Sequence, residues 1–308
     1  MLSRVALKKK RIKAQGSNRS KSFLVPFFKK ELLLLSVFVA VPAMAADRTF
    51  ATSDGVRLHY IDQGQGPPVV MVPGWTMPAW IFRTQIDDLS RHYRVIAFDP
   101  RGQGDSDIPT TGYEPLRRGR DIADLLDHLG DRPPVLLGWS LGVLDVLAYV
   151  HQFGDSRLAG LILVDNSVGA GPAPVPTARG RRWRRARPEV SREVSMRSFV
   201  RGMFVEPQPA EYLTRLTDAA LRTPADAAYA LRHYNEPREF WKDAIDATGK
   251  PILYVVTPHL QAQADDLTAH HPGVESVVLR GVGHAMFVDD PAEFDRLVMG
   301  FLSRRVWH

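Results

Sequence analysis

The chain has 308 residues, of which 44% are hydrophobic and 24% charged, and it contains no cysteine. This composition is typical of a globular protein, and the missing cysteines exclude disulfides, thiol nucleophiles and thiolate metal sites. The net charge is +6, but residues 1–45 carry ten Lys/Arg and one acid, a net of +9, which leaves −3 for the rest. Because the basic charge lies in that segment, the pI of 9.6 does not indicate a nucleic-acid partner.

Residues 1–45 have the pattern of a secretory signal peptide. A basic stretch ends at Lys30, an apolar run covers Leu32–Val41, and Ala43 and Ala45 supply the small residues of a cleavage site. We predict cleavage after Ala45 and export to the periplasm or the medium. The apolar run is shorter than the roughly 20 residues that a spanning helix needs, so we expect no stable membrane anchor. An uncleaved anchor is the alternative.

Short apolar runs alternate with helical stretches in residues 46–167 and again in 250–308. This pattern favours an α/β fold, in which a mostly parallel sheet is covered by helices on both faces. The segment Arg57–Asp62, with the glycine-rich turn after it, predicts a hairpin leading into the next strand. The predicted buried strands are Val69–Val72, Val95–Phe98, Val135–Leu137, Leu161–Val164, Ile252–Val256 and Ser276–Leu279, and the predicted helices include Ile122–Leu129 and Leu141–Phe153.

The alternation stops between Val168 and Lys250. The stretch opens with a Gly/Pro/Ala-rich segment and continues as helical, Ala/Arg/Leu-rich sequence. We predict a helical cap over residues 168–249, inserted between two strands of the core. Within it, the basic cluster Arg181–Arg185 could bind an anionic partner, although a solvated helix face is the alternative that we favour.

The sequence Gly138-Trp139-Ser140-Leu141-Gly142 joins a predicted strand directly to a predicted helix. This is G-x-S-x-G in the structural context that the motif requires, where a sharp turn exposes the serine hydroxyl. A serine hydroxyl is a weak nucleophile without a base, and His284 lies in a glycine-containing loop after the last predicted strand. The backbone N–H groups of Leu141 and Trp75 are the candidates for an oxyanion hole, because Trp75 follows the strand Val69–Val72.

With these motifs the chain resembles the α/β-hydrolase superfamily, in the branch with a helical cap, over Thr49–Leu302. The string Asp99–Ser106 resembles a D-x-R-G-x-G-x-S loop that is structural in that family. The resemblance implies an eight-stranded, mostly parallel sheet and no metal or cofactor. Similar members are carboxylesterases, lactonases, cofactor-free haloperoxidase-like perhydrolases and carbon–carbon bond hydrolases. Epoxide hydrolases and haloalkane dehalogenases share the cap but use an aspartate nucleophile, so Ser140 argues against both.

The acid of the triad departs from the commoner family pattern. Most relatives carry it after the strand equivalent to Ile252–Val256, where this chain has Leu260. Asp265 and Asp266 come later and are predicted to lie inside a helix. The family's second solution places the acid at the end of the preceding strand, which is Asp165 here. We predict that Asp165 orients His284, and the alternative is that it caps the following loop.

These residues predict an exported serine hydrolase that cleaves a carboxylic ester or lactone through an acyl-enzyme. The alternatives are a perhydrolase or carbon–carbon bond hydrolase on the same residues, or a non-catalytic binding protein of this fold. The partner that we expect is a small ester-like substrate with an apolar acyl or aryl group. Large apolar side chains near the catalytic positions suggest this, although they could equally be core residues: Trp139, Met286, Phe287 and Met77.

Overall fold

A computed structural model of the protein describes residues 45–130, 132–173 and 191–308. The predicted signal peptide, apart from Ala45, and the cluster Arg181–Arg185 lie outside the described residues.

The centre of the fold is an eight-stranded sheet with the order β1-β2-β4-β3-β5-β6-β7-β8. Strands β3 to β8 run parallel to their neighbours, while β2 pairs antiparallel with both β1 and β4. The predicted fold class, an α/β protein with a mostly parallel sheet, is therefore confirmed. The strands are β1 (Ala46–Ala51), β2 (Arg57–Gln63), β3 (Pro68–Val72), β4 (Arg94–Phe98), β5 (Val135–Trp139), β6 (Gly160–Val164), β7 (Ile252–Val256) and β8 (Val274–Val278).

The predicted hairpin between β2 and β3 is wrong. Strand β2 forms its hairpin with β1, in a register that pairs Ala46 with Asp62 and Ala51 with Arg57. Strand β4 lies between β2 and β3, because the chain crosses over after the turn at Gly64 and Gly66. The alternation of polar and apolar residues in β2 thus predicted a strand correctly, but it did not predict which strands pair with it.

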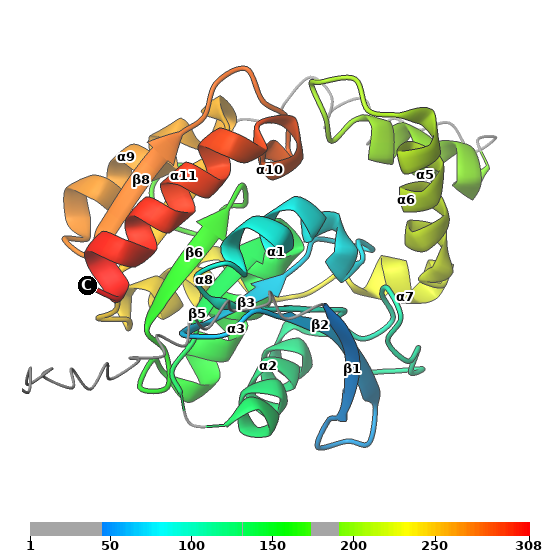
Figure 1. Ribbon diagram of the computed structural model, residues 1–308, viewed down its shortest axis with the longest axis horizontal. Helices are drawn as coiled ribbons and strands as arrows, with labels where there is room; N and C mark the ends of the chain where they lie inside the picture. Colours follow the sequence, from blue (N-terminus) through cyan, green and yellow to red (C-terminus); the bar gives the residue numbers. More distant parts are fainter. Residues whose placement is uncertain (1–44, 131, 174–190) are drawn as a thin grey trace, which may run out of the picture. The chain divides into compact units, whose positions relative to one another are not determined.

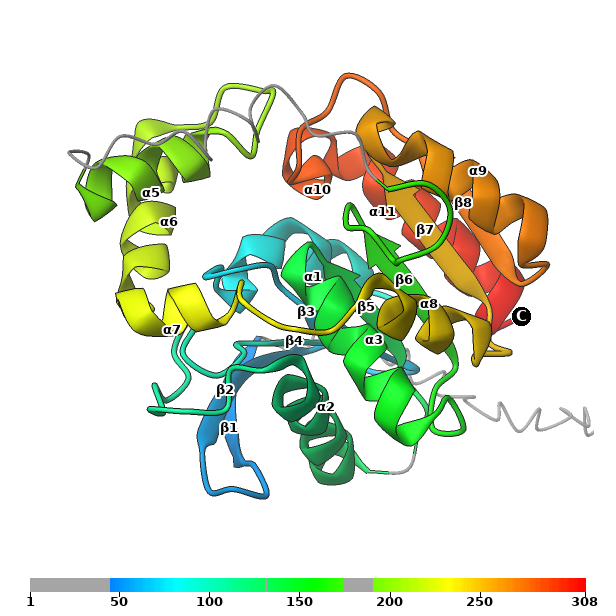
Figure 2. The same ribbon diagram turned by 180° about the vertical axis from the view of Figure 1, so that it is seen from behind.

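Helices cover both faces of the sheet (Figures 1 and 2). Along β3, Val70 and Val72 pack on one side with α2 and α3, whereas Val69 and Met71 pack on the other with α1 and α11. This alternation follows from the two-residue period of a strand. The helices are α1 (Arg83–Leu89), α2 (Pro115–Leu129), α3 (Leu141–Phe153), α5 (Arg192–Arg201), α6 (Ala210–Arg222), α7 (Ala225–Ala230), α8 (Arg238–Asp246), α9 (Gln261–His270), α10 (Met286–Asp289) and α11 (Pro291–Phe301). Short helical turns add Ala79–Phe82, Pro258–Leu260 and Leu302–Val306.

In the described part of the predicted cap, between β6 and β7, all the regular secondary structure is helix. Helices α5, α6 and α7 stand beside the sheet near the ends of its strands (Figure 2). Helix α8 differs, because it packs against α3 and its Trp241, Ala244 and Ile245 join the core beneath the sheet. The segment 168–249 that we predict as a cap therefore includes one helix, α8, that packs on the core. No helix among the described residues is long and apolar enough to cross a membrane.

Candidate active site

Ser140 occupies a tight turn between β5 and α3. Its φ of 55° lies in the left-handed region, which is strained for a residue with a side chain. The flanking glycines make this turn possible. A Cβ on Gly138 would lie 2.4 Å from the Gly142 carbonyl oxygen, and one on Gly142 would lie 2.2 Å from the Val72 oxygen. Only glycine at both positions lets α3 start this close to β3 and β5.

His284 bridges Ser140 and Asp165. Its Nε2 lies 2.8 Å from Ser140 Oγ, and its Nδ1 lies 2.7 Å from Asp165 Oδ2. Ser140 follows β5 and Asp165 follows the adjacent β6, so the two side chains emerge at the same edge of the parallel sheet. The structure thus brings together the three residues that the sequence singled out as nucleophile, base and acid.

Asp165 is almost fully buried, and hydrogen bonds compensate for its desolvation. Thr257 donates to Asp165 Oδ1 twice, from its backbone N at 2.8 Å and from Oγ1 at 2.7 Å. Burial by itself would raise the pKa of Asp165, but the bonds from His284 and Thr257 outweigh it and hold the pKa below its ordinary value. The carboxylate is therefore ionised and can accept the Nδ1–H of His284.

Thr257 directly follows β7, whose end is the commoner position of the acid in the family that the sequence resembles. Its hydroxyl lies 2.6 Å from Nδ1 of the exposed His259. Since that hydroxyl donates to Asp165, His259 must be the donor in this contact. Leu260 is buried, and Asp265 and Asp266 lie inside α9. The end of β7 therefore carries no candidate acid of its own. Its Thr257 instead donates hydrogen bonds to Asp165, which follows β6.

The candidate oxyanion hole lies between the loop after β3 and the start of α3. Trp75 and Leu141 line the same cavity as Ser140, and neither backbone N–H donates a hydrogen bond to another described residue. Gly74 allows the close approach, because a Cβ there would lie 2.9 Å from Ser140 Cβ. Gln103 holds the loop, accepting from Thr76 N at 2.7 Å and donating to Gly74 O at 3.2 Å. The loop Asp99–Ser106 thus has a structural role.

The apolar side chains predicted to contact substrate lie in the core. Trp139, Met77, Met286 and Phe287 are each at most 1% exposed, and none lines the cavity at Ser140. Trp139 instead donates from Nε1 to the His284 carbonyl at 2.8 Å, which fixes the loop that carries His284. Neighbours along the chain point to opposite sides of a strand or into a helix, so adjacency in sequence to Ser140, His284 or Trp75 did not predict which side chains line the cavity.

The cavity beside Ser140 has a volume of about 230 Å³. Sequence reasoning missed most of its walls, because Arg232 and Tyr234 lie in a segment of the cap without a motif. Asn166 was the one wall residue outside the predicted set with a sequence signal, because it directly follows the predicted acid Asp165. Its side-chain amide donates to the Ser140 carbonyl at 2.7 Å. The residues lining the cavity are Trp75, Ser140, Leu141, Leu144, Asn166, Arg232 and Tyr234.

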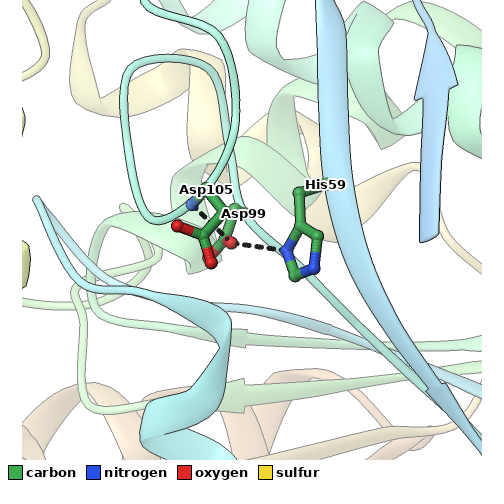
Figure 3. Close-up of side chains that lie close together, drawn as sticks. All are labelled: His59, Asp99 and Asp105. Carbon is green, nitrogen blue, oxygen red and sulfur yellow. Dashed lines mark hydrogen bonds and ion pairs between the residues drawn. The ribbon is translucent and has the colours of Figure 1, made fainter. Parts of the chain in front are cut away.

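A second cluster, His59, Asp99 and Asp105, has the donor types of a metal site (Figure 3). However, the Asp99 carboxylate already accepts from His59 Nδ1 at 2.8 Å, Asp105 N at 2.9 Å and Ala79 N at 2.5 Å. The hydrogen bond to Asp99 raises the pKa of His59, which favours a protonated imidazole that cannot ligate through that nitrogen. The cluster fits a buried ion pair that anchors the loop after β4 better than a cation site.

Comparisons with known proteins agree with this architecture. A sequence model of an alpha/beta hydrolase family matches residues 69–297. A non-heme chloroperoxidase of Streptomyces lividans is 40% identical over 119 residues, which cover 38% of this chain and 43% of that protein. A soluble epoxide hydrolase of Corynebacterium sp. (strain C12) is 34% identical over 131 residues, covering 42% of this chain and 46% of that protein.

Among solved structures, a thermophilic esterase from Thermogutta terrifontis superposes with a TM-score of 0.66 at 25% identity. The superposition covers 85% of this chain and 99% of the esterase. The two curated relatives above are matched over less than half of their own length. The similarity thus extends over the whole fold in structure, but over a shorter region in sequence.

Proposed function

This chain belongs to the alpha/beta hydrolase family, and we propose that within it the protein is a serine hydrolase that cleaves a carboxylic ester or lactone. The observation that carries the proposal is the hydrogen-bonded series from Ser140 Oγ through His284 to the buried Asp165 carboxylate, with contacts of 2.8 and 2.7 Å. An ionised acid on Nδ1 leaves Nε2 as the proton acceptor facing the serine, which is the arrangement that a general base needs.

The geometry supports acyl transfer in two steps. Ser140 Oγ attacks the carbonyl carbon while His284 Nε2 takes its proton, and the N–H groups of Trp75 and Leu141 stabilise the oxyanion. His284 then gives the proton to the departing alcohol, and the C–O bond of the ester breaks. Water, deprotonated by His284, cleaves the resulting acyl-enzyme and releases the acid.

Perhydrolysis is the second candidate, and the chloroperoxidase relative favours it. In that reaction hydrogen peroxide replaces water in the second step, so the same acyl-enzyme yields a peracid. Epoxide opening is less well supported despite the epoxide hydrolase relative, because the nucleophile position carries Ser140 rather than the aspartate of such enzymes. A non-catalytic binding role does not account for the strained backbone at Ser140 or for the buried, ionised carboxylate of Asp165.

The test is covalent labelling followed by turnover. We expect a fluorophosphonate probe to label Ser140, and Ser140→Ala or His284→Ala to abolish burst release from 4-nitrophenyl esters with the fold intact. Loss of a triad member typically costs on the order of 10⁴ to 10⁶ in rate. Wild-type turnover by Ser140→Ala on every ester would contradict the assignment. Comparing acid with peracid formation in the presence of peroxide separates hydrolysis from perhydrolysis.

We also propose that the protein is exported and cleaved after Ala45. The basic and apolar pattern of residues 1–45 supports this, and β1 begins at Ala46, so cleavage there leaves the sheet complete. Mass spectrometry of the protein from periplasm and medium is the measurement. A mature N-terminus upstream of Leu32, or protein found only in the cytosol, would contradict export.

A further inference from the structure

Among the described residues that line the cavity at Ser140, Arg232 is the only charged one. It lies just after α7, where its backbone N–H bonds to the Tyr229 carbonyl at 3.1 Å and closes the end of the helix. The residue therefore reaches the catalytic cavity from the cap, whereas Ser140 comes from the sheet.

Two contacts hold Arg232 near the candidate oxyanion hole. The Trp75 indole Nε1 donates to the Ala228 carbonyl at 2.7 Å, which ties α7 to the loop after β3. The Arg232 guanidinium carbon lies 5.0 Å from the centre of the Trp75 ring, within range of a cation–π interaction. Resting on this ring restricts the long side chain, so less conformational entropy remains to be lost when it binds a ligand.

The guanidinium has no acidic partner among the described residues. Other arginines of the fold do: Arg101 pairs with Asp121 at 2.6 Å, and Arg94 pairs with Asp62 at 2.8 Å. Arg232 is exposed, and its guanidinium donates no hydrogen bond to a described residue, so its donors and its positive charge are available to a ligand in the cavity that it lines. A planar guanidinium is suited to bidentate hydrogen bonding with a carboxylate.

Tyr234 lines the same wall and carries a neutral hydroxyl group. Its hydroxyl makes no hydrogen bond to a described residue, and its ring packs edge-on against Trp241 with centroids 5.7 Å apart. Burial raises the pKa of Tyr234, so the phenol keeps its proton at neutral pH. Leu141 and Leu144 supply the apolar part of the lining, which accommodates a short hydrocarbon segment.

We propose that Arg232, assisted by the Tyr234 hydroxyl, binds a carboxylate on the substrate, so that the preferred substrates are small esters carrying an anionic group. This inference rests on the proposed esterase function and names its substrate class. The cavity of about 230 Å³ is below the range of about 300–1,000 Å³ that is usual for drug-sized ligands, which favours short substrates.

The experiment compares esters of similar size and shape, one member of each pair anionic and the other neutral. One pair varies the acyl side, the mono-4-nitrophenyl ester of glutarate against 4-nitrophenyl pentanoate. The other varies the alcohol side, 4-acetoxybenzoate against its methyl ester. We expect the wild-type enzyme to prefer the anionic member of at least one pair. Arg232→Gln should lower kcat/KM for that ester about 10- to 100-fold, mainly through KM, and change the neutral ester less than about threefold.

Two further variants sharpen the result. Arg201→Gln is the matched control, because Arg201 is an exposed arginine at the end of α5 and lies outside the cavity. It should leave both esters unchanged. Tyr234→Phe should weaken the anionic preference by about threefold to tenfold, since it removes one hydrogen bond. The effect of Arg232 should shrink as ionic strength rises.

Equal loss of activity on anionic and neutral esters in Arg232→Gln would overturn the inference, since Arg232 would then serve the oxyanion or the fold. Absence of any anionic preference in the wild type would overturn it too. Calorimetric binding of the preferred anionic ester to Ser140→Ala, with and without Arg232→Gln, measures affinity at the site without turnover. Equal affinity of these two proteins refutes the role of Arg232, whereas absent fluorophosphonate labelling in the wild type refutes only the proposed function.

Discussion

Replacing Asp165 by Asn tests the proposed action of its carboxylate on His284. The Asn side chain has one oxygen and one NH₂ group, and its surroundings decide which group faces His284. Thr257 presents two donors to the Oδ1 position, at 2.8 and 2.7 Å. The Asn oxygen therefore faces Thr257, and the NH₂ group faces His284 Nδ1. That nitrogen must then accept, which puts the proton on Nε2, opposite Ser140 Oγ, where a base cannot carry one.

The fall in kcat can be worked out from the hydrogen bonds that hold the Asn amide in this orientation. Turning the amide around forfeits both Thr257 bonds, about 1–3 kcal/mol in total. The transition state also loses the carboxylate partner of the imidazolium, a charged hydrogen bond worth about 1.5–3 kcal/mol. The sum corresponds to a fall in kcat of roughly 10² to 10⁴. Folding should be little affected, because the Asn oxygen keeps the Thr257 donors and the buried charge disappears.

Pre-steady-state release of 4-nitrophenol gives the acylation rate of the Asp165→Asn enzyme, and thermal unfolding reports its stability. We expect a melting temperature within a few degrees of the wild type. Asp265→Asn is the control, because Asp265 is exposed on α9, and its kcat should change less than about threefold. Near-normal turnover in Asp165→Asn, together with collapse in Asp265→Asn, would refute the assignment of the acid.

Three more predictions test other parts of the fold. Gly74→Ala would place a Cβ 2.9 Å from Ser140 Cβ and displace the oxyanion loop, so kcat should fall about 10²- to 10³-fold without unfolding; full activity would exclude that loop from the oxyanion hole. Thr257→Val removes the Oγ1 donor to Asp165 but keeps the backbone donor, and kcat on an aryl ester should fall about tenfold, while an unchanged kcat would show that the hydroxyl is dispensable. Burial is the main cause that raises the pKa of Asp295 to about 6, above the usual 3.8, so its contribution to stability is complete below about pH 3.8 and is lost as the pH rises through about 6. Asp295→Asn should therefore raise the free energy of unfolding by about 1–3 kcal/mol at pH 8 and by little at pH 4; lower stability at pH 8, measured by urea denaturation, would contradict this reasoning.

Local sequence predicted the strands of the core well because buried parallel strands are continuous apolar runs. The predicted Ile252–Val256 has the bounds of β7, and the predicted Leu141–Phe153 has those of α3. The G-x-S-x-G turn was predictable for a related reason, since its geometry depends on residues within five positions. Pairing was less accessible, because the alternation in β2 does not say which strand lies beside it.

The walls of the cavity could not be predicted from the sequence. Arg232 and Tyr234 are separated from Ser140 by about 90 positions and reach it only through the packing of α7 on Trp75. Likewise, the sequence of α8 does not distinguish it from a cap helix, because only tertiary packing places its Trp241 among core residues. Motifs identify the chemistry of a site, whereas its selectivity comes from contacts between distant segments.

The cap is attached to the catalytic loops through its main chain. Trp75 donates to the Ala228 carbonyl at 2.7 Å, and the backbone N–H of Ala285, next to His284, donates to the Met203 carbonyl at 3.0 Å. Every residue type has a carbonyl, so substitutions at positions 203 and 228 leave both acceptors in place. Cap residues around the cavity can therefore be substituted while the loops of Trp75 and His284 keep these two hydrogen bonds to the cap. If the proposed esterase function holds, libraries that vary Arg232 and its neighbours should change which esters are accepted while Ser140, His284 and Asp165 keep their arrangement.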